Sequence, residues 1–219
     1  AWDVPAPEAP GSEQPAAAGR TRAELCALAE RLGEKRFRGN QLFEGLYRHR
    51  WLAREAFTNL PGSRRGRLRT EAEPGWPRLA ESLASNDGST KHAFELRDGC
   101  TVEGVHMPFA DRATLCLSSQ VGCAMGCTFC ATGQMGIRRN LTPGEILGQI
   151  VLMLDAHAHP QGRPVNLVFM GMGEPLHNLD HVMAAFRILT DPRGLAIPPR
   201  RVTLSTSGLV PGIARLGTF

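Results

Sequence analysis

The sequence predicts an α/β protein whose strands form either a parallel sheet or a (β/α) barrel. Three strand-like runs, at 113–118, 165–170 and 201–205, alternate with helical segments at roughly 40-residue spacing. In both folds the chemistry belongs at the carboxyl ends of the strands. The content of 42% hydrophobic and 21% charged residues excludes collagen-like and wholly disordered chains.

Each element of this region has a local signal. Thr142-Pro143-Gly144-Glu145 combines an N-cap threonine, a first-turn proline and a capping-box glutamate, and predicts a helix to about His157. The next helix is expected over 179–189. The longest apolar stretch, 146–154, is much shorter than the ~18 residues of a membrane span, so we expect no membrane partner.

The sequence ahead of the three strands divides into three segments. Residues 1–19, rich in alanine and proline, carry three acids and no base, and predict a disordered tail. Residues 20–79 carry fourteen Lys and Arg against seven Asp and Glu, although the whole chain has a net charge of only +4. Residues 80–112 contain the turn signals Asn86-Asp87-Gly88 and Asp98-Gly99, which predict antiparallel hairpins. Residues 113–219 hold the strand–helix units.

The basic segment 20–79 is expected to be helical. A capping box at Thr21 and Glu24 begins one helix, and a second is predicted over 40–49, with Leu42, Phe43, Leu46 and Tyr47 facing inward. A third, after residue 62, carries the arginines at 64, 65, 67 and 69. These arginines form either a solvated helix face or a patch that contacts the phosphates of RNA. We interpret the segment as an RNA-binding accessory domain.

Three of the six cysteines fall within eight positions directly after the first strand. Cys123, Cys127 and Cys130 form a C-x3-C-x2-C pattern, and glycines at 122, 126 and 133 let the backbone wrap around a bulky ligand. Three thiolates are one fewer than a saturated [4Fe-4S] cluster requires, so one iron stays open. S-adenosylmethionine can chelate that iron. The alternatives are a zinc site completed elsewhere and buried inert thiols.

Longer motifs resemble one family. The C-x3-C-x2-C pattern is similar to that of the radical S-adenosylmethionine superfamily. Within it, LCLSSQVGCAMGCTFCATGQMGIRRNLT (115–142), NLVFMGMGEPLHNLD (166–180) and RRVTLSTSGLVPGI (200–213) resemble the RNA adenine C2-methyltransferases of the RlmN/Cfr type. The resemblance implies half of a six-unit (β/α) barrel, preceded by a small helical domain and a β-hairpin segment. It also implies a [4Fe-4S] cluster and S-adenosylmethionine as cofactors.

The resemblance implies a role for each matching residue. Cys123, Cys127 and Cys130 would bind the cluster. Gly173 and Glu174 would contact the methionine amino group of S-adenosylmethionine, and Ser205 the cosubstrate. A helix N-terminal charge and a simple cap are the plain alternatives for Glu174 and Ser205.

Two further residues would carry chemistry. Glu103 would accept a proton from the adenine adduct, and Cys116 would resolve a covalent protein–RNA intermediate through a disulfide. By sequence alone, Glu103 is a surface acid and Cys116 a buried thiol. Cys26 and Cys100 are expected to be structural.

The family methylates adenosine in large-subunit ribosomal RNA and in transfer RNA, and needs a cellular electron donor, which indicates the cytoplasm. Its methyl-carrying cysteine belongs to a C-terminal part that has no counterpart here, since the sequence ends at Phe219 after three units. We therefore expect a truncated chain that is inactive alone. The alternatives are C8 methylation, a zinc-containing RNA-binding module and an inactive remnant.

Overall fold

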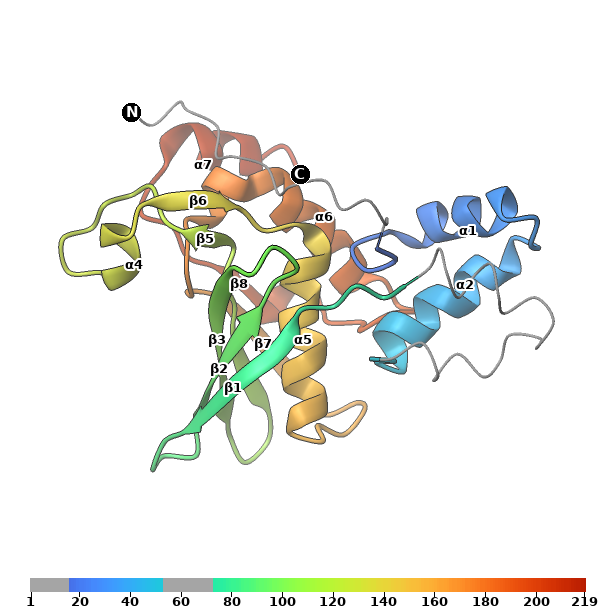
Figure 1. The fold of residues 1–219 in the computed structure, drawn as a ribbon, viewed down its shortest axis with the longest axis horizontal. Helices are drawn as coiled ribbons and strands as arrows, with labels where there is room; N and C mark the ends of the chain where they lie inside the picture. Colours follow the sequence, from blue (N-terminus) through green and yellow to red (C-terminus); the bar gives the residue numbers. More distant parts are fainter. Residues whose placement is uncertain (1–15, 53–72) are drawn as a thin grey trace.

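The protein is built around one mixed β-sheet with helices packed on one face. A computed structural model describes residues 16–52 and 73–219. Helices α5 (Pro143–Ala156) and α6 (Leu179–Thr190) pack on the sheet, and α1 (Arg22–Arg31) and α2 (Phe37–Phe43) lie on the far side of α5 (Figure 1). The predicted tail lies mostly outside the described residues, and so does the predicted helix that carries the arginines at 64, 65, 67 and 69.

The main sheet has six strands in the order β1-β2-β3-β4-β7-β8. The first three are antiparallel, and β3 pairs antiparallel with β4, which continues in parallel with β7 and β8. The strands are β1 (Arg78–Ala84), β2 (Thr90–Glu95), β3 (Thr101–Pro108), β4 (Ala113–Cys116), β7 (Val165–Phe169) and β8 (Val202–Leu204). The predicted hairpins and parallel strands are therefore confirmed, and both belong to one continuous sheet.

Shorter elements connect and flank these strands. A two-stranded ribbon of β5 (Gln120–Gly122) and β6 (Ile137–Asn140) carries the cysteine loop between its strands. The other short elements are α4 (Ala131–Gln134), the 3₁₀ helices η3 (Pro175–Asn178) and η4 (Pro199–Arg201), and α7 (Val210–Leu216).

The helical segment follows its sequence signals with one difference. The capping box of Thr21 and Glu24 is formed at α1. The four side chains predicted to face inward, from Leu42 to Tyr47, are all buried. The second helix begins earlier than predicted, at Phe37, and its last turn is a π-helix, η1 (Glu44–Arg48).

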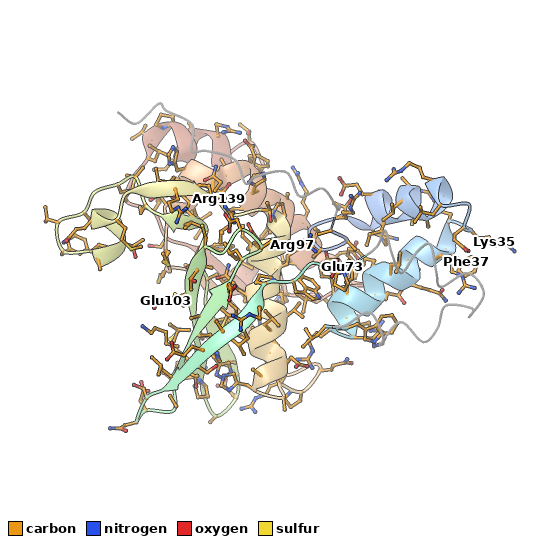
Figure 2. The ribbon with its side chains drawn as sticks, in the orientation of Figure 1. Lys35, Phe37, Glu73, Arg97, Glu103 and Arg139 are labelled. Atoms are coloured by element: carbon orange, nitrogen blue, oxygen red, sulfur yellow. The ribbon has the colours of Figure 1, made fainter. Side chains whose placement is uncertain are left out.

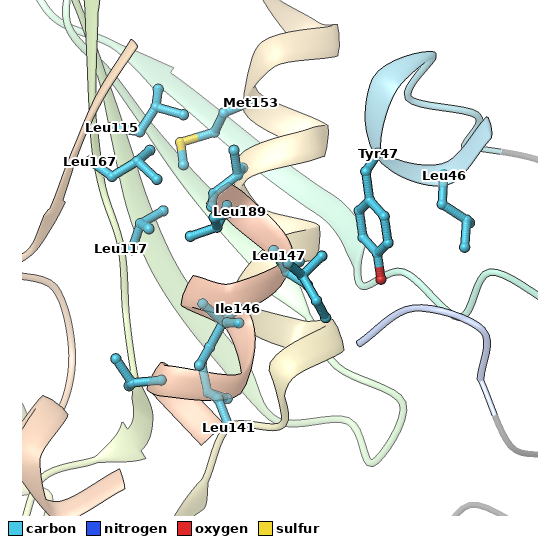
Figure 3. Close-up of a cluster of buried hydrophobic side chains, with 14 of the residues drawn as sticks. Leu46, Tyr47, Leu115, Leu117, Leu141, Ile146, Leu147, Met153, Leu167 and Leu189 are labelled. Carbon is cyan, nitrogen blue, oxygen red and sulfur yellow. The ribbon is translucent and has the colours of Figure 1, made fainter. Parts of the chain in front are cut away.

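The hydrophobic core lies between the sheet and helices α5 and α6. Leu115 and Leu167 from the sheet meet Ile146 and Met153 of α5 and Leu189 of α6 (Figure 3). Because α5 is apolar on several sides, its other flank packs against the segment that carries Leu46 and Tyr47 (Figure 3). Burial of each large apolar side chain contributes about 1.5–3 kcal/mol.

A buried arginine connects the ribbon of β5 and β6 to the rest of the molecule. Arg139 of β6, with a side chain only 6% exposed, binds Asp98 through Nε at 2.8 Å and Glu145 through Nη2 at 2.9 Å (Figure 2). Glu145 also closes the capping box of α5. The hydrogen bond from Arg139 holds the pKa of Asp98 well below its usual range. The hairpin turn, the ribbon and the start of α5 are thus fixed together.

No helix formed by residues 16–52 or 73–219 has the length and apolar character needed to cross a membrane.

Three histidines cluster between the antiparallel strands and the end of α5. His92 Nε2 lies 2.9 Å from His157 Nε2, and the rings of His106 and His157 stack with centroids 3.7 Å apart. Burial lowers the pKa of all three, and the charges of His157, His159 and His92 help to lower that of His106 to about 4. The neutral forms are therefore the ones that fit this packing.

These lowered pKa values predict acid-dependent stability. Between about pH 6.5 and pH 4 the unfolded chain binds more protons than the folded one, so stability falls as the pH is lowered through this window. His106→Phe keeps an aromatic ring against His157 but removes one titrating group. We expect its thermal unfolding midpoint to fall less steeply than that of the wild type between pH 6.5 and pH 4.5. An equal slope in both proteins would contradict this interpretation.

Candidate active site at the carboxyl ends of the parallel strands

The segments that follow β4, β7 and β8 meet at one end of the sheet. After β4 the chain enters Ser118, Ser119 and Gln120, after β7 it enters the GMGEP turn, and after β8 it reaches Ser207. Hydrogen bonds connect all three segments. This is the end at which α/β folds place their chemistry.

Glu174 is the centre of this region. Its carboxylate is buried, since the residue is only 3% exposed. Oε2 accepts hydrogen bonds from the backbone N–H of Ser207 at 2.8 Å and from its hydroxyl at 2.9 Å, and Oε1 accepts one from Leu176 N–H at 3.0 Å. Glu174 therefore joins the loop after β7 to the loop after β8 by charge-assisted hydrogen bonds.

Gly173 permits a close crossing of two loops. Its φ is +99°, and a Cβ at this position would lie 2.5 Å from the Cβ of Gln120. Gln120 in turn accepts a hydrogen bond from Glu174 N–H at 2.9 Å and donates one to Asn140 at 2.8 Å. A side chain at position 173 would separate Gln120 from Glu174, so only glycine fits here.

A second set of buried polar groups supports the end of β4. Ser118 exchanges hydrogen bonds through its backbone N–H and C=O with the side-chain amide of Gln149 in α5, at 2.9 and 3.1 Å. Its hydroxyl donates to the backbone oxygen of Glu103 at 2.5 Å and accepts from Met172 N–H at 2.8 Å. The strand β3, the helix α5 and the turn after β7 are thus held at fixed positions around Ser118.

The three cysteines of the motif lie together in the loop between β5 and β6. Cys123 is buried, and Cys127 and Cys130 are half-buried in a turn closed by the bond from Cys130 N–H to Cys127 C=O, 3.1 Å long. Burial raises the pKa of Cys123, and the neighbouring charges of Cys127, Glu174 and Cys130 raise it further. Glu174 therefore lies near enough to Cys123 for its charge to act on that thiol.

The cysteine loop fits an iron–sulfur cluster. Its three thiols are free and are the soft donors that iron–sulfur clusters take. Gly126 has a φ of +63° and no atom within 4 Å of an added Cβ, so the loop is open at its tip. Within residues 16–52 and 73–219, no three metal-binding side chains converge on one point. Convergence is needed for a single ion, whereas a cubane cluster binds each thiolate through a different iron.

Cys116 and Glu103 lie on the face of the sheet opposite to α5. Cys116 pairs with Val105 of β3, two residues from Glu103, and side chains two residues apart share a face. Glu103 is half exposed and bound to Lys91 Nζ at 2.9 Å, on the strands far from Lys35 and Phe37 (Figure 2). Burial raises the pKa of Cys116, so its thiol is protonated at neutral pH.

Some residues of the site were not found from the sequence. Ser205 is exposed directly after β8, and the serine that binds Glu174 is Ser207. Gln120, Asn140 and Gln149 also carry the buried network without having been expected. Gln149 is signalled by its polar side chain inside the apolar stretch 146–154, whereas Gln120 and Asn140 follow other polar residues and have no such signal.

The remaining two cysteines are not part of the cysteine loop. Cys26 is buried in α1 with its Sγ 3.5 Å from Asn40, and Cys100 is buried in the main core. All six cysteines are free thiols in the structure.

Comparisons with known proteins agree with this geometry. The family model of the radical SAM superfamily matches residues 117–216. The dual-specificity RNA methyltransferase RlmN of Halorhodospira halophila is 47% identical over 199 residues, which are 90% of this chain and 55% of that protein. A probable dual-specificity RNA methyltransferase RlmN of Moorella thermoacetica is 49% identical over 88% of this chain and 56% of its own length.

A solved structure is also similar to this chain. A crystal structure of a radical SAM methyltransferase from Sphaerobacter thermophilus has a TM-score of 0.86 and 41% sequence identity, covering 92% of this chain and 59% of that one. The chain spans about half the length of the curated relatives it matches. With the cysteine loop at the carboxyl end of β4 and a fold shared over nine-tenths of its length, the chain belongs to the radical S-adenosylmethionine superfamily and, within it, to the family of RlmN RNA methyltransferases.

Proposed function

We propose that this chain is the cluster- and cosubstrate-binding part of an RNA methyltransferase that adds a methyl group to C2 of adenosine in ribosomal and transfer RNA. The observation that carries the proposal is the loop of three free thiols after β4, whose Cys123 lies near enough to the buried Glu174 after β7 for the carboxylate to raise the pKa of that thiol. The names of the relatives support RNA as the substrate. RNA incubated with the reconstituted whole enzyme, then digested and analysed by mass spectrometry, tests the methylation and separates C2 from C8.

The cofactors implied by the superfamily are a [4Fe-4S] cluster and S-adenosylmethionine. Cys123, Cys127 and Cys130 would hold the cluster, leaving one iron for the cosubstrate. When bound, the cluster supplies the electron that cleaves the sulfonium of S-adenosylmethionine. A separate electron donor of the cell must therefore act as a partner. This requirement favours a cytoplasmic location for the protein.

Glu174, Gly173 and Ser205 are proposed to bind S-adenosylmethionine. A carboxylate can accept hydrogen bonds from the ammonium of the methionine moiety. Glu174 already accepts three hydrogen bonds, which fix its orientation before any ligand binds. A carboxylate oxygen has further lone-pair capacity, so these bonds leave room for one more donor.

Glu103 and Cys116 are proposed to act on the RNA. Their shared face of the sheet is the one that α5 does not cover, and this supports the proposal that a base reaches both side chains. Glu103 would take up a proton on its carboxylate. Cys116 would act through its sulfur, and its half-buried thiol, whose pKa is raised by desolvation, must lose a proton first.

Methyl transfer needs one more cysteine than these residues supply. Three of the six are assigned to the cluster and Cys116 to product release, while Cys26 and Cys100 are buried and are not part of the cysteine loop. We therefore propose that residues 1–219 alone do not methylate RNA.

The cluster assignment predicts the effect of removing one ligand. Cys127→Ser should lower the iron and sulfide content after anaerobic reconstitution well below the roughly four irons of a complete cluster. Cys26→Ser is the matched control, because it removes a buried thiol of α1 outside the cysteine loop and its supporting contacts, and should keep the wild-type content. Full iron in Cys127→Ser, or one zinc and no sulfide in the wild type, would refute the assignment.

The cosubstrate assignment predicts the effect of neutralising Glu174. Glu174→Gln keeps the shape but loses the charge, and we expect about tenfold or greater weakening of S-adenosylmethionine binding by equilibrium dialysis. Ser207→Ala is the matched control, since it removes one hydrogen bond to the carboxylate and leaves its charge. If both variants weaken binding equally, Glu174 only positions the loop and does not contact the ligand.

A further inference from the structure

A basic cavity lies at the opposite end of the sheet from the candidate active site. Its volume is about 430 Å³, within the range of about 300–1,000 Å³ typical of small-ligand sites. Pro164 and Val165 at the start of β7 line it, as does Arg201, which directly precedes β8. Since β7 has five residues, about 16 Å separates this cavity from the carboxyl end of the strand.

Four arginines line the cavity: Arg48, Arg50, Arg163 and Arg201. They come from η1 and the residues after it, the loop after α5, and η4, which are distant in sequence. No Asp or Glu is among the described lining residues, and none of the four forms an ion pair within the part of the chain that the structure describes. The cavity therefore concentrates uncompensated positive charge.

Neutral oxygens hold three of the four guanidinium groups in place. Arg50 donates to His159 C=O at 2.9 Å, Arg201 to Asn166 Oδ1 at 2.9 Å, and Arg163 to the carbonyls of Phe109 and Ala110 at 2.9 and 3.0 Å. These bonds use one or two of the five donors of each guanidinium, so the remaining N–H groups are available to a ligand.

Another cavity of similar size differs, because most of its arginine charge is paired with carboxylates. The second cavity, of about 450 Å³, also contains arginines, but Arg139 there binds Asp98 and Glu145, and Arg97 binds Glu73. In the basic cavity the same charges lack such partners. Two of its residues, Arg50 and Ala196, also have a left-handed φ of 54° and 53°, a strain that proteins retain mainly at binding sites.

The remaining wall is apolar. Leu154, Leu195 and Ile197 line it together with prolines. Guanidinium forks match the oxygens of a phosphate, and an apolar wall matches a flat base or sugar. The cavity is also larger than a bare phosphate requires. We infer that it is a second binding site, for the phosphate and nucleoside of one nucleotide, supplied either free or within an RNA strand.

Binding measurements on the full chain test this inference. The probes are adenosine 5′-monophosphate, inorganic phosphate and a short single-stranded oligoribonucleotide. The double variant Arg48→Gln/Arg201→Gln should weaken nucleotide or RNA binding by about tenfold or more, because it removes two charged donors. Arg31→Gln removes an exposed charge from the end of α1 and is the control. It should bind as the wild type does.

The outcomes separate the two sources of phosphate. Adenosine monophosphate binding that the double variant loses identifies a free nucleotide, and loss with the oligoribonucleotide alone identifies an RNA phosphate. Equal loss in Arg31→Gln, or wild-type binding by a folded double variant, would overturn the inference. If the double variant does not fold, the test is hydrogen exchange of the wild type, which should slow at residues 159–165 and 192–198 when probe is added. Unchanged exchange there would equally overturn it.

Discussion

The buried carboxylate of Glu174 is the interaction on which the architecture of this site depends. It binds the loop after β8 through Ser207, while its own backbone binds Gln120 after β4. One almost completely buried residue thus holds together three segments that are distant in the sequence. A buried charge without partners would be strongly destabilising, so the surrounding donors are required as much as the carboxylate itself.

The sheet explains how groups distant in sequence face the same space. Because β3 pairs antiparallel with β4, the hairpins are continuous with the parallel strands. Glu103 and Cys116 therefore share one face of the sheet, and helices α5 and α6 cover the other (Figure 1). The basic cavity lies at the opposite end of the parallel strands from the candidate active site. The two sites are therefore separated by the length of the strands.

Local signals predicted most of the fold because they act over a few residues. The capping boxes at Thr21 and Thr142, and the glycine turns at Gly88 and Gly99, form where the sequence indicates. The cysteine loop was found for the same reason, since its three ligands are neighbours. The motifs after β7 and β8 were located through a resemblance to longer family segments.

Features that depend on tertiary contacts could not be predicted. The hydrogen bond from Ser207 to Glu174 depends on how the loop after β8 turns, and no local sequence signal indicates it. The role of the buried amides of Gln120 and Gln149 becomes visible only in the folded chain, where they accept hydrogen bonds from backbone N–H groups of the surrounding loops. The arginines of the basic cavity come from three distant segments, so no window of sequence contains them.

We propose that Cys123, Cys127, Cys130 and Glu174 are sufficient for this chain to bind the cluster and cleave S-adenosylmethionine. The most direct test is to reconstitute this chain anaerobically, add a chemical reductant and S-adenosylmethionine, and measure 5′-deoxyadenosine. We expect 5′-deoxyadenosine to form, because the three thiols and Glu174 lie within this chain. A chain that carries the full cluster and binds S-adenosylmethionine yet releases no 5′-deoxyadenosine would contradict this proposal.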